Sequence, residues 1–229
     1  MDYFLKEYKQ KCKQEFGQYG FKAYRNNHCR VVHDVFQSFS LHRSVSGLDA
    51  TVEFGIVPLG VDYDLDKSFV NPYHLKQFEN RGGWFEYNRN SSASISACIN
   101  EMIGYIKTYL MPLFEQAIDC QSAYEVMCKN NNIFTGNSIE KFCMCLKFGD
   151  YARAKFYIEE VISQYKYAYA RNREILGSDI PQDYIQKMEK EIFELRNLQS
   201  WVIDEKRNDI NKWLGTNEKR NKENLGCKS

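Results

Sequence analysis

The sequence predicts an α+β protein, in which a small antiparallel sheet packs against helices and is followed by an all-helical C-terminal extension with long antiparallel helices. Two observations carry this prediction. Before about residue 90, several segments alternate apolar and polar residues, which is the period of a strand. From Ser91 onward, nearly every apolar residue recurs at spacings of three and four, which is the period of a helix. We therefore divide the chain into an α+β head, residues 1–130, and a helical tail, residues 131–229.

The composition is that of a globular protein without a long-range electrostatic field. The net charge is +1, so nothing draws the whole molecule toward nucleic acid or anionic lipid. The N-terminal residues include early acids, and no window approaches the roughly 18 apolar residues of a membrane span. We therefore expect a cytoplasmic protein with no membrane contact, whose eight cysteines stay reduced.

The head begins with an amphipathic pattern and continues with strands. Residues 2–16 predict a helix that ends at Gly17 and Gly20. Residues 30–42 and 49–57 predict two strands joined by a hairpin at 44–47. The residues expected to face the core are Leu5, Tyr8, Cys12 and Phe16 on the helix, and Val31, Val35, Phe39, Leu41, Ala50, Val52, Phe54 and Ile56 on the strands, with Thr51 and Glu53 pointing outward.

The second half of the head predicts a loop, a short strand and two helices. Residues 61–81 read as a loop, and residues 84–87 as a third strand. A helix over 93–117 has serine N-caps from Ser91 onward, and Pro112 should kink it because a proline has no N–H to donate. A shorter helix covers about 121–129. Cys98, Cys128 and Cys143 are expected on apolar helix faces.

The tail predicts three helices with tight connections. The first starts near Asn137 and ends at Gly149-Asp150, and the second ends at Gly177. The third begins near Pro181 and continues toward Trp213, a rod of about 45 Å that needs a partner along its length. Residues 215–229 are polar and are expected to fray.

Short motifs in the head match a known pattern. They are Gly20-Phe21-Lys22, Tyr24-Arg25, Phe36-Gln37-Ser38, Val52-x-Phe54-Gly55-Ile56, Trp84-Phe85 and Leu110-x-Pro112-Leu113. On these motifs, residues 1–127 resemble DUF4304, a bacterial domain family of unknown function. The resemblance implies an α+β domain and brings no catalytic residues with it. The turn over 146–154 is similar to the inter-helix turn of a tetratricopeptide unit, but no second copy follows at the ~34-residue period, so we expect a single helical hairpin.

Four clusters suggest chemistry, and each has a structural interpretation that we prefer. His28-Cys29 with His33 lacks a second ligand pair. Cys143 and Cys145 would point apart on a helix. Asp62, Asp64 and Asp66 start like a calcium loop, but Lys67 and Tyr73 stand where glycine and glutamate are required. The basic segment 218–222 is short and predicts a solvated terminus. We therefore expect no metal, no cofactor and no catalytic residue.

The function that the sequence favours is a non-catalytic protein-interaction module, and the specific version of this hypothesis is an immunity or defence role. Its partner would be another protein or a second copy, bound by the sheet face or by the long C-terminal helices. The alternative is a small-molecule-binding or hydrolytic enzyme with a cleft in the head. Binding of nucleic acid is a third, weaker hypothesis. The residues expected to line the cleft or interface are Arg25, Gln37, Glu53, Trp84 and Tyr87.

Overall fold

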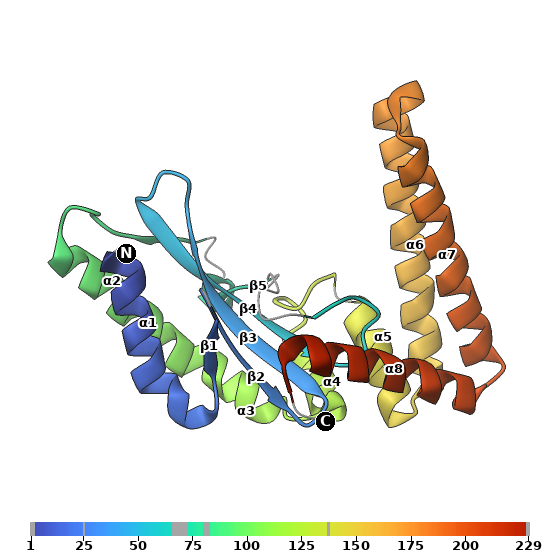
Figure 1. Ribbon diagram of the computed structural model, residues 1–229, viewed down its shortest axis with the longest axis horizontal. Helices are drawn as coiled ribbons and strands as arrows, with labels where there is room; N and C mark the ends of the chain where they lie inside the picture. The colour runs from blue at the N-terminus through green and yellow to red at the C-terminus, as the bar shows by residue number, and fades with distance from the viewer. Residues whose placement is uncertain (1–2, 25, 66–72, 80–82, 137, 228–229) are drawn as a thin grey trace.

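In the computed structural model, residues 3–24, 26–65, 73–79, 83–136 and 138–227 are described, and they confirm the predicted α+β class (Figure 1). An antiparallel sheet lies in the N-terminal part and helices make up the C-terminal part. The strands are β1 (Lys22–Tyr24), β2 (Asn27–Val32), β3 (Val35–Arg43), β4 (Asp49–Pro58), β5 (Tyr73–His74) and β6 (Phe85–Glu86). The α-helices are α1 (Tyr3–Phe16), α2 (Ser92–Tyr105), α3 (Met111–Gln116), α4 (Cys120–Lys129), α5 (Ser138–Phe148), α6 (Tyr151–Leu176), α7 (Gln182–Ile203) and α8 (Arg207–Leu225).

The long hairpin of β3 and β4 is the centre of the sheet. The strand order is β1-β2-β3-β4-β5, and β6 also pairs with β4. Phe39 lies directly opposite Phe54 in this hairpin. The ring of Phe39 packs edge-on against Phe16 of α1 at 5.4 Å, so this face of the sheet is covered by the apolar stripe of the first helix. That stripe contains the expected Tyr8, Cys12 and Phe16, with Phe4 fully buried and Leu5 at its margin.

The prediction of a single strand over residues 30–42 was wrong. Two strands, β2 and β3, are separated by a turn in which His33 has a φ of 50°. The neighbouring Asp34 holds this turn in place, because its carboxylate accepts a hydrogen bond from the N–H of Cys120 at 3.1 Å and its carbonyl accepts one from Leu59 at 2.8 Å. Contacts with distant segments therefore make the turn, and no glycine or proline marks it in the sequence.

Strand β4 was predicted correctly in extent but not in the environment of its second face. Ala50, Val52, Phe54 and Ile56 are buried as expected. Thr51 and Glu53, which were expected to face solvent, are buried too, at 0% and 9% exposure. The alternation of polar and apolar residues therefore marks two faces of different polarity, both of which are covered.

The helix expected over 93–117 is divided by a widened turn. Helix α2 begins at the predicted cap, where the Ser94 N–H donates to the Ser91 hydroxyl at 3.2 Å. A π-helical segment over Ile106–Leu110 then leads into α3, with Pro112 in its first turn. The backbone hydrogen-bond pattern changes from α-helical to π-helical before Pro112. The hydrogen bond that Pro112 cannot donate therefore does not interrupt a regular α-helix.

The tail forms a hairpin of two long helices and then returns to the head. Helices α6 and α7 pack against each other within the chain and project away from the sheet (Figure 1). The predicted rod from Pro181 to Trp213 was wrong, because α7 ends at Ile203 and the chain reverses through Glu205, which has a φ of 48°. The expectation that residues 215–229 fray was also wrong, because α8 continues to Leu225.

Helix α8 docks on the segment that follows β4 through two buried asparagines. Asn221 donates to the carbonyls of Leu59 and Val61 at 2.9 and 3.2 Å, and its Oδ1 accepts from the N–H of Leu65 at 2.9 Å. One turn earlier, Asn217 donates to the Gly60 carbonyl at 3.2 Å. Side chains of the head and the tail consequently belong to one continuous hydrophobic core. Among the described residues, no helix combines the length and the apolar character needed to cross a lipid bilayer.

Candidate functional site

The residues expected to line a cleft are distributed over different parts of the head. Gln37 is fully buried, where its amide donates to the carbonyls of Phe114 and Ala117 at 2.8 and 2.7 Å and accepts from Arg30 Nε at 2.7 Å. Gln37 therefore joins the sheet to the end of α3. Tyr87 is also buried, with its ring 4.5 Å from that of Phe4.

His42, which was not among the predicted site residues, contacts both Glu53 and Trp84. The Glu53 Oε1 atom is 2.9 Å from His42 Nδ1, and the His42 ring meets Trp84 edge-on at 5.4 Å. In the register of β3 and β4, Ser40 and His42 face Glu53 and Thr51, on the sheet face opposite Gln37. Arg25 lies outside the described residues. The alternation of the two strands was the available signal for His42, because it places His42 and Glu53 on the same face.

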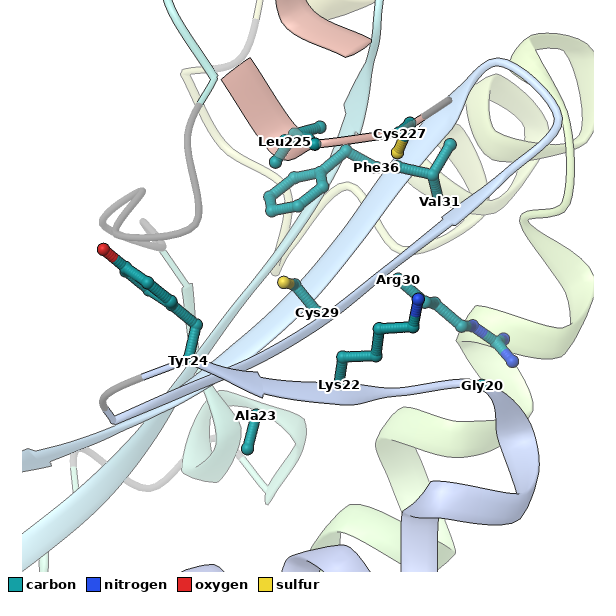
Figure 2. A pocket seen from close by; sticks show the side chains of 11 residues that line it. Gly20, Lys22, Ala23, Tyr24, Cys29, Arg30, Val31, Phe36, Leu225 and Cys227 are labelled. Carbon is teal, nitrogen blue, oxygen red and sulfur yellow. The ribbon is translucent and has the colours of Figure 1, made fainter. Parts of the chain in front are cut away.

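A groove of about 550 Å³ opens between the edge of the sheet and the end of α8 (Figure 2). Cys29 and Phe36 face it from the sheet, and Leu225 and Cys227 close it from α8. Lys22 on β1 supplies a positive charge at its rim. Sequence reasoning missed this groove because one wall is the segment expected to fray. The described lining contains no carboxylate and no histidine, so it offers binding contacts and no visible acid–base pair.

The projecting hairpin carries a second surface, made of exposed apolar side chains. Of the fourteen large hydrophobic residues that are exposed in the described parts of the chain, seven belong to α6 and α7. Five of the seven are more than half exposed: Phe156 at 56%, Tyr167 at 68%, Ile175 at 67%, Phe193 at 63% and Ile203 at 54%. A concentration of exposed apolar side chains on one part of the fold is typical of contact sites.

The cysteine and aspartate clusters have structural roles. Cys143 and Cys145 are buried on α5, and burial raises the pKa of both thiols, that of Cys145 to about 12, so neither is a ready thiolate. Cys98 is buried as expected, whereas Cys128 is exposed, contrary to the prediction. Asp64 Oδ1 forms an ion pair with Arg220 Nε at 3.0 Å, while Asp66 lies outside the described residues. Glu218 and Arg220 of the basic segment make ion pairs on α8, so the predicted solvated terminus is not formed.

Within the described residues, no group of three or more histidine, cysteine, aspartate or glutamate side chains is placed to hold a metal ion. No protein-family model matches the chain, and comparison with curated proteins and with solved structures found no similar protein.

Proposed function

We propose that this protein is a non-catalytic interaction module in which the α6–α7 hairpin is the arm that contacts a partner protein. The observation that carries the proposal is the exposed apolar surface of that arm. Two helices of 26 and 22 residues hold half of the exposed large hydrophobic side chains that are described in this 229-residue chain. Because α6 and α7 pack against each other along their inner faces, their outer faces are accessible to another molecule.

The test compares two variants of equal chemical severity. Tyr167→Ser with Phe193→Ser removes two exposed rings from the arm, and Val45→Ser with Leu48→Ser removes two exposed apolar residues from the β3–β4 turn. Quantitative capture from native lysate should show a protein that is lost with the arm variant and retained with the turn variant. Sedimentation velocity over a range of concentrations measures self-association in parallel. A monomer at every concentration, with no captured protein that depends on the arm, would refute the proposal.

The more specific version assigns the partner to a bacterial toxin or another defence component, in a cytoplasmic DUF4304-like protein. Co-expression with the captured partner tests this version, because a neutralising protein should restore growth only when its arm is intact. A partner without toxicity would remove the defence role and leave the interaction module.

A second candidate function, binding of a small molecule, is favoured by the 550 Å³ groove at the sheet edge. Its size lies within the range of about 300–1,000 Å³ that is typical of ligand pockets. A thermal-shift screen of small anions and aromatic metabolites against the wild type and Lys22→Ala measures it. A ligand whose stabilisation disappears in Lys22→Ala supports the groove, and equal stabilisation of both proteins contradicts it.

A further inference from the structure

A second recess lies at the base of the hairpin, where α7, α8 and the segment after β4 meet. Its volume is about 320 Å³. Trp201 near the end of α7 and Trp213 on α8 are both partly buried there, and they are two of the three tryptophans of the chain. The remaining lining residues are Asp62, Glu194, Asn197 and Leu198. Figure 1 shows that α8 starts at the foot of α7 and runs toward the sheet.

The carboxylates of the recess come from separate elements and act on one another. Burial raises the pKa of Asp62, and the negative charges of Glu194 and Asp64 raise it further, while Arg220 opposes the shift. Tyr165 of α6 faces the same region: burial raises the pKa of its hydroxyl, and Glu191 and Asp62 add to the shift.

Three basic side chains lie on the same elements, and they do not cancel this charge. Arg220 is 3.8 Å from Asp62 and makes its closer contact with Asp64, at 3.0 Å. Lys190 and Lys187 lie 3.8 and 3.9 Å from Glu194 and Glu191, each from one turn earlier on α7, and both are about three-quarters exposed. Four carboxylates therefore face three cations. Two of these cations are the exposed lysines at 3.8 and 3.9 Å, and the third, Arg220, makes its closer contact with Asp64. Such exposed pairs contribute little.

Indole faces beside carboxylates select one kind of ligand. The face of an aromatic ring attracts a cation, tryptophan does so most strongly, and a neighbouring carboxylate adds a charge-assisted contact. A small hydrated metal ion gains nothing from indole rings, whereas an ammonium or guanidinium group with an apolar stem uses both the rings and Leu198. The small volume fits a single such head group.

We propose that this recess binds an organic cation, an alkylammonium or guanidinium group, between Trp201 and Trp213 with Asp62 and Glu194 as counter-ions. The site does not depend on the proposed partner contact, because it lies at the foot of the arm and uses none of the exposed residues of its shaft. The cation is either the side chain of a lysine or arginine in another protein or a free small amine, and both present the same chemistry to the recess.

The experiment uses the full-length chain carrying Trp84→Phe, so that Trp201 and Trp213 are the reporters. Choline and its uncharged isostere 3,3-dimethylbutan-1-ol are titrated separately into the protein, with tryptophan fluorescence and the indole N–H resonances as readouts. Choline should bind about tenfold more tightly than the isostere, which is within the range of a partly exposed cation–π contact plus an ion pair. Equal binding of the two compounds, or no response to either, would overturn the proposal.

Two isosteric variants test the counter-ions without opening a cavity. Glu194→Gln and Asp62→Asn should each weaken choline binding severalfold, whereas Glu189→Gln, on the exposed surface of α7 and outside the recess, should leave it unchanged. Equal affinities for Glu194→Gln and Glu189→Gln would contradict the assignment. A final comparison distinguishes the two sources of the cation, and it uses spermidine and the amides of N-acetyl-lysine and N-acetyl-arginine. Tighter binding of the amides identifies a protein side chain, and tighter binding of spermidine identifies a free amine. The arm variant Tyr167→Ser/Phe193→Ser should keep its choline affinity, which separates this site from the proposed interaction surface.

Discussion

Replacing Asn221 by alanine tests whether α8 is held to the head by side-chain amides or by apolar packing alone. Asn221 is fully buried and makes three hydrogen bonds to backbone groups of residues 59–65. Alanine removes all three bonds and leaves their backbone partners without this amide inside the core. Asn217, one turn earlier, makes one such bond.

The magnitude follows from counting these bonds. A neutral hydrogen bond contributes a net ~1 kcal/mol, so three bonds contribute about 3 kcal/mol. Alanine is a better helix former than asparagine by ~0.6 kcal/mol, which partly offsets the loss. We expect Asn221→Ala to lower the free energy of unfolding by about 2–3 kcal/mol, and Asn217→Ala by only ~0.5 kcal/mol.

Urea unfolding, followed by far-UV circular dichroism and by tryptophan fluorescence, measures these losses. Asn211→Ala is the matched control, because it makes the same substitution at an exposed position of α8, where only the helix-propensity gain of ~0.6 kcal/mol applies. If Asn221→Ala costs no more than Asn211→Ala, the amide contacts do not hold the helix and the reasoning fails. If fluorescence changes before circular dichroism, α8 detaches locally before the head unfolds.

Three further predictions concern ionisable side chains. His28 is 1% exposed, burial lowers its pKa to about 4 with a smaller contribution from Lys9, and neither ring nitrogen has a partner among the described residues. The unfolded chain therefore takes up a proton that the folded protein does not, and the free energy of unfolding should fall by up to about 3 kcal/mol as the pH drops from 6.5 toward 4. His28→Phe should remove this component of the pH dependence. An unchanged profile would show that His28 is solvated. Burial raises the pKa of Glu140, although the Tyr63 hydroxyl donates a hydrogen bond to it at 2.6 Å. The free energy of unfolding should therefore fall as the pH rises through that pKa. Glu140→Gln should remove this fall when urea unfolding is measured over the same pH range. Cys128 is exposed, Cys227 is partly exposed and the other six thiols are buried, so Cys128→Ser with Cys227→Ser should abolish the fast phase of the reaction of native protein with a thiol reagent. Persistence of that phase in the double variant would indicate that a buried cysteine opens to solvent.

The elements that could be predicted from the sequence are those that local patterns specify. The stripe of α2 and its Ser91 cap follow from 3.6-residue spacing and from one side-chain hydrogen bond, and both are present as expected. Strand β4 follows from alternation, and its predicted boundaries differ from the observed ones by one residue. In these segments, the residues that decide the structure are neighbours in the chain.

The errors occur where distant contacts decide the backbone. The turn at His33 contains no glycine or proline and depends on Asp34, which binds the start of α4 86 residues away. The reversal at Glu205 looks like a continuing helix, because Trp201, Val202 and Trp213 keep a helical period on both sides of it. The polar composition of residues 215–229 predicts fraying, yet two of their asparagines bond to backbone groups more than 150 residues earlier.

The candidate sites were hidden for the same reason. Trp213 was expected at the end of a long helical rod and Asp62 in a loop, and nothing in a linear pattern brings these residues together with Trp201. The reversal after α7 brings them together, because it folds α8 back across the loop after β4. A recess between elements of this kind becomes predictable only when the position of the reversal is known.

The docking of α8 and the proposed cation site are thermodynamically coupled. Asp62 belongs to the head, Glu194 to the hairpin and Trp213 to α8, so a ligand that contacts all three binds only when α8 is in place. By linkage, the free energy by which such a ligand stabilises the docked state equals the binding free energy that the ligand loses when α8 undocks. Stabilisation at a given ligand concentration is RT ln(1 + [L]/Kd), so the Asn221→Ala variant, whose undocked fraction lowers its apparent affinity, should gain less stability than the wild type from the same concentration of organic cation. An equal affinity in both proteins would show that the recess does not depend on α8.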